Sequence, residues 1–146
     1  MINVIFLALV VGVSDGDTLT ALTDDKQQIK IRLANIDAPE KNQPFGQRSK
    51  QSLSDLCFKK QADIKPQTID RYGRTVAVVT CEGREANRHQ VGMGLAWVYP
   101  KYNKDFSLPA LEQGARLNGL GLWADRDPVP PWEWRKARKT KSNGEK

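Results

Sequence analysis

The chain has 146 residues and carries 23 lysines and arginines against 17 aspartates and glutamates, a formal net charge of +6. This length fits one domain, and no apolar run is long enough to cross a membrane as a helix. The positive charge favours a polyanionic partner, such as nucleic acid or an anionic membrane surface, although many globular proteins carry such a charge for solubility alone.

The N-terminal stretch, residues 2–13, is apolar except for Asn3 and Gly12. It is similar to the hydrophobic centre of a signal peptide, but it lacks a basic start, and no small-residue cleavage site precedes Asp15. Cleavage within the stretch would also remove a strand that leads into Asp15. We therefore expect a first strand over Val10–Val13, and the residues before it are either more strand or the remnant of an export signal.

A polar turn follows this strand. The segment Asp15-Gly16-Asp17 places two acids around a glycine, which allows a tight backbone and brings Asp17 round. Residues 18–22 are predicted to continue as a second strand. Residues 23–27 then form a polar hairpin loop, whose two aspartates we interpret as solvated loop residues and not as metal ligands.

The third predicted strand, residues 28–33, ends in a cluster of charged side chains. Apolar and basic residues alternate in it, so Arg32 lies on the face opposite the apolar side chains. Pro39 ends the strand, and Asp37 and Glu40 emerge there in fixed backbone. Carboxylates bind hard cations such as Ca²⁺ or Mg²⁺, and a guanidinium binds phosphate. The alternative is a surface salt-bridge cluster, which these residues favour when taken alone.

A helix is predicted from Pro44 to about Phe58, because small and apolar residues recur on one face of it. We expect this helix to cover the core. It carries Cys57, and Cys81 is the other cysteine of the chain. The pair permits either one disulfide or two buried thiols. Nothing nearby predicts a zinc site, since the only histidine is His89.

Two more strands and a turn occupy the middle of the chain. Residues 62–69 are predicted to form a strand, and Pro66 favours an edge position for it. Residues 75–81 are predicted to form the next strand. The turn between them carries Asp70, Arg71, Tyr72 and Gly73, and Arg74 starts the strand that follows. Two arginines and a tyrosine therefore precede an apolar strand.

The last third of the chain predicts two helices. Residues 85–93 form a short one, and residues 95–99 are apolar core. Ser107 is expected to cap a third helix of the chain, with Gly119 after its end. We interpret Trp123 as a core residue and not as a base-stacking platform.

The C-terminal end is predicted to lack regular structure. Residues 128–134 are expected to form an ordered, extended wrap, because Trp132 and Trp134 have apolar area to bury. Residues 135–146 are basic and poor in apolar side chains, so we expect them to be disordered. The chain is thus divided into one domain over residues 1–134 and a basic tail.

Three of these segments form an ordered set: Asp15-Gly16-Asp17-Thr18, then Arg32-x-x-x-Ile36-Asp37-x-Pro39-Glu40, then Asp70-Arg71-Tyr72-Gly73-Arg74. Each motif alone is weak, whereas three in this order beside predicted strands are specific. From about Val11 to Trp123 the chain resembles the staphylococcal nuclease (thermonuclease) family. The resemblance implies an α+β, mainly β fold, a five-stranded OB-fold barrel with about three helices, which the periodicities allow.

The resemblance also implies a Ca²⁺ ion. Its ligands would be the carboxylates of Asp17 and Asp37 and the backbone carbonyl of Ala38, with water completing the coordination. The best-known family member has threonine where this chain has Ala38, and a carbonyl ligand survives that change.

The implied catalytic residues are Arg32, Glu40 and Arg74. Glu40 would deprotonate the attacking water. Arg32 would bridge the scissile phosphate, and Arg74 would stabilise the charge that develops in the transition state. The substrate-binding candidates are Arg71, Tyr72, Tyr99 and Tyr102. For Arg71 and Tyr72 the alternative is a solvated turn, and the tyrosines could stack on a base.

The function that follows from the resemblance is a Ca²⁺-dependent, sugar-nonspecific endonuclease that hydrolyses single-stranded or frayed DNA and RNA to 3′-phosphate products. We expect a monomer that is secreted or periplasmic. The alternative is a nucleic-acid-binding OB-fold module without catalysis, which the five retained charged residues argue against. A membrane-surface protein has only charge in its favour, because no amphipathic basic helix is predicted.

Overall fold

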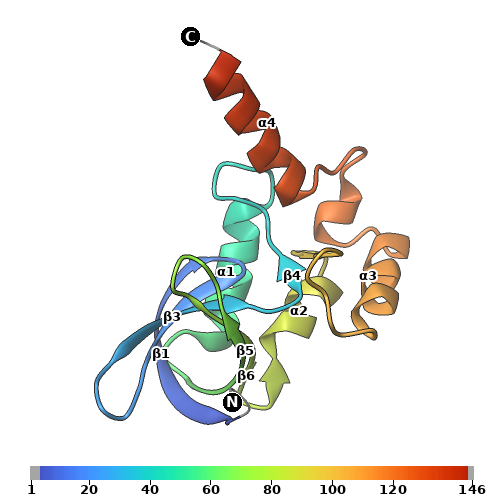
Figure 1. Ribbon diagram of the computed structural model, residues 1–146. Helices are drawn as coiled ribbons and strands as arrows, with labels where there is room; N and C mark the ends of the chain where they lie inside the picture. The colour runs from blue at the N-terminus through green and yellow to red at the C-terminus, as the bar shows by residue number, and fades with distance from the viewer. Residues whose placement is uncertain (1–3, 145–146) are drawn as a thin grey trace.

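The computed structural model describes residues 4–144, and its centre is a closed five-stranded barrel (Figure 1). The barrel strands are β1 (Phe6–Asp15), β2 (Thr18–Leu22), β3 (Gln28–Leu33), β5 (Gln61–Ile69) and β6 (Thr75–Cys81). Neighbours in the order β3-β2-β1-β5-β6 are antiparallel. A parallel pairing of β3 with β6 closes the barrel, so the five-stranded OB-fold prediction is confirmed.

Alternation along the strands builds the core. Every second residue points into the barrel, and the inward positions combine large or β-branched side chains with alanines. Val10, Leu19, Ile31, Ile64 and Val79 all have no exposed surface. The first strand starts at Phe6, four residues before the predicted Val10, so the apolar stretch ahead of it is largely strand.

Strand β5 is not the edge strand that Pro66 predicted. It lies between β1 and β6 in the sheet. Pairing with β1 ends at Ile64, and the register with β6 shifts between Pro66 and Thr68. Pro66 therefore sits beyond the β1 partner and beside an irregularity, where the missing N–H removes no ladder hydrogen bond.

Helix α1 (Gly46–Cys57) covers the barrel, as predicted, and packs against β1. It starts two residues later than expected, because Phe45 adopts a left-handed conformation. Cys57 at its end forms a disulfide with Cys81 at the end of β6. The alternative of two buried thiols is therefore wrong. Closing a loop of this length stabilises a fold by about 3 kcal/mol in the chain-entropy account.

The remaining elements are two short strands, β4 (Ile36–Asp37) and β8 (Trp97–Val98), which pair with each other, β7 (Arg84–Glu85), and the helices α2 (Ala86–Gly92), α3 (Leu108–Leu117) and η1 (Gly121–Ala124). Ser107 does not cap α3 through its side chain; its hydroxyl donates to Asp105 Oδ1 instead. Gly94 is required where it stands, because a Cβ there would lie 2.1 Å from the Leu120 carbonyl oxygen.

The C-terminal segment differs most from the prediction. Helix α4 (Pro131–Gly144) replaces the extended wrap from Pro131 onward and most of the disordered tail, and it extends away from the barrel (Figure 1). Pro131 suits a first helical position, since its missing N–H has no partner there. The predicted division after Trp134 falls inside this helix, and residues 145–146 lie outside the described part of the chain. No helix within residues 4–144 has the length and apolarity needed to cross a membrane.

Candidate functional site

The candidate site forms where the β1–β2 turn meets the end of β3. Thr18 pairs with Arg32, and the backbone N–H of Leu33 donates to the Asp17 carbonyl at 2.8 Å. Asp17 therefore lies beside the residues that leave β3. Its carboxylate is fixed from both sides, because Oδ1 accepts from the Thr18 hydroxyl at 2.9 Å and Oδ2 from the Ala38 N–H at 2.7 Å.

A tight turn after β3 brings Asp37 back toward Arg32. Asn35 has a φ of 74°, a left-handed conformation that asparagine tolerates better than most residues. Its side-chain oxygen accepts from the Lys104 N–H at 2.9 Å, and its carbonyl accepts from the Tyr99 N–H at 2.8 Å. The chain then enters β4, whose Asp37 pairs with Trp97, so the Asp37 backbone is held in a small sheet.

Arg32 joins the two carboxylates. Its Nη1 donates to the Leu33 and Ile36 carbonyls at 2.8 and 2.9 Å, which locks the guanidinium against the turn. Its Nη2 lies 3.2 Å from Asp37 Oδ1 and 3.4 Å from Asp17 Oδ2. The three side chains predicted to act together are therefore in contact, with the Asp37 side chain only 1% exposed.

A buried polar network supports the Asp15–Asp17 turn. Gly16 is needed for close packing, since a Cβ would lie 1.8 Å from Ser49 Oγ on α1. The amide of Gln90 on α2 donates to the Gly16 carbonyl at 2.7 Å and to the Ser49 carbonyl at 2.9 Å. Sequence reasoning explained Gly16 by backbone freedom, whereas the structure explains it by the approach of α1.

Negative charge is concentrated at the site. Burial raises the pKa of Asp15, Asp37 and Glu40 above their ordinary values, and the charge of Asp17 raises all three further. Arg32 opposes the shift of the pKa at Asp15 and Asp37. A cation placed among these carboxylates would relieve the repulsion between them.

Arg135, from the second turn of α4, is a site contact that the sequence reasoning missed. Its Nη2 lies 2.7 Å from Asp37 Oδ2 and its Nη1 lies 3.1 Å from Asp37 Oδ1, a two-pronged pairing. Nη1 also lies 3.8 Å from Glu40 Oε2. The hydrogen bonds and charge of Asp37 raise the pKa of Arg135, although its burial acts in the opposite direction.

The sequence does contain a pattern that points to Arg135. Pro131 marks a helix start, and Trp132 and Arg135 are three residues apart, on one face of such a helix. Trp132 stacks on Tyr99 with 5.3 Å between ring centroids. An aromatic anchor followed by an arginine on the same face predicts a contact with the protein, whereas the basic composition suggested a solvated tail.

Arg74 lies at the start of β6 and is paired with Asp70. Its Nε lies 2.8 Å from Asp70 Oδ2, and the N–H groups of Tyr72 and Arg74 donate to Asp70 Oδ1. Burial acts to raise the pKa of Asp70, but these hydrogen bonds bring it below its ordinary value. Arg74 immediately precedes β6, in which Val76 pairs with Arg32 in the parallel register, so the segment that carries Arg74 runs beside the end of β3. Within the described residues, its ion pair is with Asp70 and not with Asp37 or Glu40.

The turn residues Arg71 and Tyr72 are exposed beside Arg74. Arg71 Nη2 donates to the Tyr72 hydroxyl at 2.8 Å. The guanidiniums of Arg71 and Arg74 lie 5.0 and 5.3 Å from the centre of the Tyr72 ring, in the range of cation–π contacts. These three residues form a cationic group at the rim, with the Tyr72 residue 69% exposed.

The two other substrate-binding candidates differ in accessibility. One face of Tyr99 is covered by Trp132, and Tyr102 contacts Tyr99 edge-on at 4.9 Å. Tyr102 is exposed, and the exposed Lys101 ammonium lies 5.4 Å from the centre of its ring, so a base that stacks there would meet a cation. The structure therefore brings both tyrosines next to the start of α4, with only Tyr102 free to act as an exposed platform.

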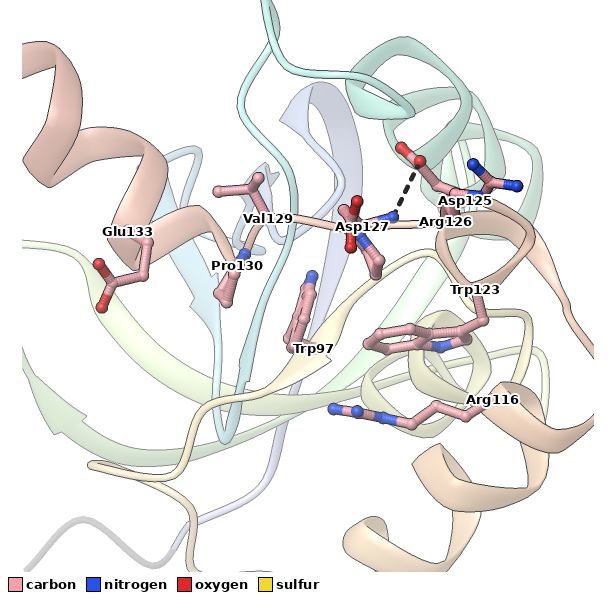
Figure 2. A pocket seen from close by; sticks show the side chains of 10 residues that line it. Trp97, Arg116, Trp123, Asp125, Arg126, Asp127, Val129, Pro130 and Glu133 are labelled. Carbon is pink, nitrogen blue, oxygen red and sulfur yellow. Dashed lines mark hydrogen bonds between the residues drawn. The ribbon is translucent and has the colours of Figure 1, made fainter.

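A shallow surface pocket is lined mainly by residues from Trp123 to Pro130 (Figure 2). Trp97 and Trp123 line it, and Figure 2 shows the Arg116 side chain beneath the Trp123 ring. The Arg116 guanidinium lies 4.1 Å from that ring centre and pairs with Glu112 at 3.0 Å. The two tryptophan rings pack edge-to-face at 4.5 Å. Trp123 is thus engaged in packing, and none of the candidate catalytic residues lines this pocket.

The chemistry of the carboxylate cluster suits a hard cation. Carboxylate and carbonyl oxygens are ligands that Ca²⁺ accepts, whereas zinc sites use histidine and cysteine. Within residues 4–144 there is no group of three or more His, Cys, Asp or Glu side chains arranged to hold a metal. A cation at Asp17 and Asp37 would therefore depend on backbone oxygen and water as well.

Comparison with known proteins identifies related sequences. The profile described as "Staphylococcal nuclease homologue" matches residues 30–125, a range that contains Arg32, Asp37, Glu40 and Arg74. A protein of Haemophilus influenzae, called an uncharacterized endonuclease, is 47% identical over 130 residues, covering 89% of this chain and 73% of the relative. A micrococcal nuclease of Shigella flexneri is 40% identical over 149 residues, covering 94% of this chain and 85% of the relative.

Proposed function

The chain belongs to the staphylococcal nuclease family, and from that premise we propose that it is a Ca²⁺-dependent nuclease that cleaves DNA and RNA and leaves 3′-phosphate ends. The observation that carries the proposal is the contact of Arg32 with both Asp17 and Asp37. Buried ion pairs contribute little net stability, so a fold gains little by keeping this one. A catalytic role explains why this ion pair is present, because the two carboxylates would bind a cation and the guanidinium would bind a phosphate.

Asp17, Asp37 and the Ala38 carbonyl would hold the ion. The ion would supply positive charge to the phosphate as negative charge gathers on its oxygens. The Ala38 N–H donates to Asp17, which keeps this backbone beside the carboxylates and supports the choice of its carbonyl as a ligand.

Glu40 would act as the general base. It lies within the charge cluster, and its pKa is raised by burial and by the neighbouring acids, which brings a carboxylate closer to the basicity that proton abstraction requires. The proton of the attacking water would pass to the Glu40 carboxylate.

Two arginines would neutralise the phosphate. Arg32 is locked by the Leu33 and Ile36 carbonyls, so its remaining donors are preorganised. Arg74 lies on the segment that runs beside the end of β3 and would act from a second side, after exchanging its Asp70 partner for a phosphate oxygen. Arg71, Tyr72 and Tyr102 would extend this contact toward neighbouring nucleotides.

We propose single-stranded or frayed nucleic acid as the substrate, because the exposed rings of Tyr72 and Tyr102 could stack on unpaired bases. We also propose an oxidising compartment, secreted or periplasmic, which the Cys57–Cys81 disulfide supports.

Glu40→Gln tests the mechanism. We expect cleavage of single-stranded DNA to slow by about 10²- to 10⁴-fold, the usual contribution of general base catalysis, with binding largely retained. Glu133→Gln, which removes an exposed glutamate of α4, is the matched control and should cleave normally. The measurement is the single-turnover rate with saturating Ca²⁺. Equal rates in the two variants would remove Glu40 from the mechanism. Wild-type protein that binds DNA without cutting it would favour the non-catalytic OB-fold module.

A further inference from the structure

Arg135 occupies Asp37, one of the two carboxylates that the proposed function assigns to a cation. Both oxygens of Asp37 accept from its guanidinium, at 2.7 and 3.1 Å. Asp37 Oδ1 also accepts from Arg32 at 3.2 Å. Because the Asp37 side chain is 1% exposed, its oxygens have little open space for a further partner. A metal ion that binds Asp37 must therefore displace at least one of these donors.

The two arginines differ in how firmly they are held. Arg32 is 13% exposed and is anchored by two backbone carbonyls as well as by carboxylates. The Arg135 side chain is 39% exposed, and its ion pairs are with Asp37 and Glu40. The Arg135 guanidinium can move toward solvent without breaking a contact within the barrel. Arg32 would have to break its hydrogen bonds to the Leu33 and Ile36 carbonyls.

Helix α4 keeps Arg135 close to the site even after such a withdrawal. Trp132, one turn earlier, stacks on Tyr99 and contacts Trp97 edge-to-face at 5.6 Å. This aromatic contact does not involve the carboxylates. The start of α4 is thus anchored independently, and only the guanidinium has to move.

We propose that Arg135 competes with the divalent cation for Asp37, serving as an internal counter-ion that the metal must displace. The inference rests on the proposed function, because it takes the cation to bind at Asp17 and Asp37. Two positive groups within a few ångströms of each other on the same carboxylates repel, so occupancy by one weakens the other. The contact between Arg135 of α4 and Asp37 therefore raises the cation concentration that is needed to fill the site.

Calorimetric titration of the full chain with Ca²⁺, without nucleic acid, tests this competition. Arg135→Gln should bind the ion about tenfold more tightly than wild type, within the usual 5- to 150-fold range for two coupled ligands. Arg138→Gln is the control, because it removes the same charge from an exposed position one turn further along α4. It should bind Ca²⁺ nearly as wild type does. Arg135→Lys keeps the charge but loses the two-pronged geometry, so an intermediate affinity is expected.

Several outcomes would overturn the competition. One is an equal Ca²⁺ affinity in Arg135→Gln and Arg138→Gln. The others are weaker Ca²⁺ binding in Arg135→Gln than in wild type, and no Ca²⁺ binding in any variant. Thermal unfolding in chelator shows whether the variants are folded, and Arg135→Lys preserves the test should Arg135→Gln unfold.

The cleavage assay of the wild-type protein separates this inference from the proposed function. Suppose that wild type cuts DNA with Ca²⁺ but both glutamine variants bind Ca²⁺ with equal affinity. That result would overturn the competition and leave the nuclease assignment intact. Tighter binding by Arg135→Gln in a chain that cuts nothing would support the competition and contradict the assignment.

Discussion

The charged side chains at this site are placed close together, in an arrangement that adds little to the stability of the fold. Asp17, Asp37 and Glu40 are brought together although burial raises the pKa of Asp37 and Glu40. Each carboxylate is paired or hydrogen-bonded, which offsets the cost of desolvation without producing a net gain. Such an arrangement persists where a reaction uses it.

Arg74 provides a test at this scale. Its Nε is paired with Asp70 Oδ2 at 2.8 Å, and the proposed function has it exchange this partner for a phosphate oxygen. If it acts mainly in the transition state, Arg74→Ala should lower kcat by about 10²- to 10³-fold and change KM much less. Steady-state kinetics on single-stranded DNA with saturating Ca²⁺ measures both constants.

Arg71→Ala is the matched control, since it removes an arginine from the same turn. Its effect should fall mainly on KM, because Arg71 is exposed at the rim. A change confined to KM in Arg74→Ala would instead make Arg74 a simple phosphate clamp, contrary to this account.

Among the elements, the strands were predictable and helix α4 was not. The bounds of β2, β3 and β6 agree with the strands predicted over residues 18–22, 28–33 and 75–81, of which 28–33 was predicted from two-residue alternation. Helix α4 was missed because its stability comes from two tertiary contacts, Trp132 on Tyr99 and Arg135 on Asp37. Neither contact is visible in local composition, which is dominated by lysine and arginine.

Helix α2 carries the one histidine of the chain, His89, which allows a test of how the free energy of unfolding depends on pH. Burial lowers the pKa of His89, and the charge of Arg84 lowers it further. The unfolded chain, with an ordinary pKa near 6.5, therefore takes up the proton first as the pH falls. The free energy of unfolding should thus decrease more steeply below about pH 6.5 in wild type than in His89→Gln.

Chemical denaturation at a series of pH values between about 8 and 5 measures this difference. The stability of wild type relative to His89→Gln should fall as the solution becomes acidic. A relative stability that stays constant over this range, or that rises in acid, would show that folding does not disfavour protonation of His89.

On the scale of the whole molecule, the barrel brings together segments that are far apart in the chain. The order of three motifs was enough to predict the barrel and the grouping of Asp17, Arg32 and Asp37, since the family resemblance supplies the non-local topology. The closure of β3 on β6 could not come from periodicity, because alternation does not specify a partner. The Cys57–Cys81 bond was left open for the same reason, as spacing does not give the distance between two thiols.

The central claim is that this barrel is a cation-dependent nuclease, and digestion of single-stranded DNA by the wild-type chain tests it most directly. The reaction would be run with added Ca²⁺, repeated with excess chelator, and the ends of the products would be analysed. This account predicts degradation that requires Ca²⁺ and leaves 3′-phosphate ends. Undegraded DNA in the presence of Ca²⁺, or equal degradation in chelator, would contradict it.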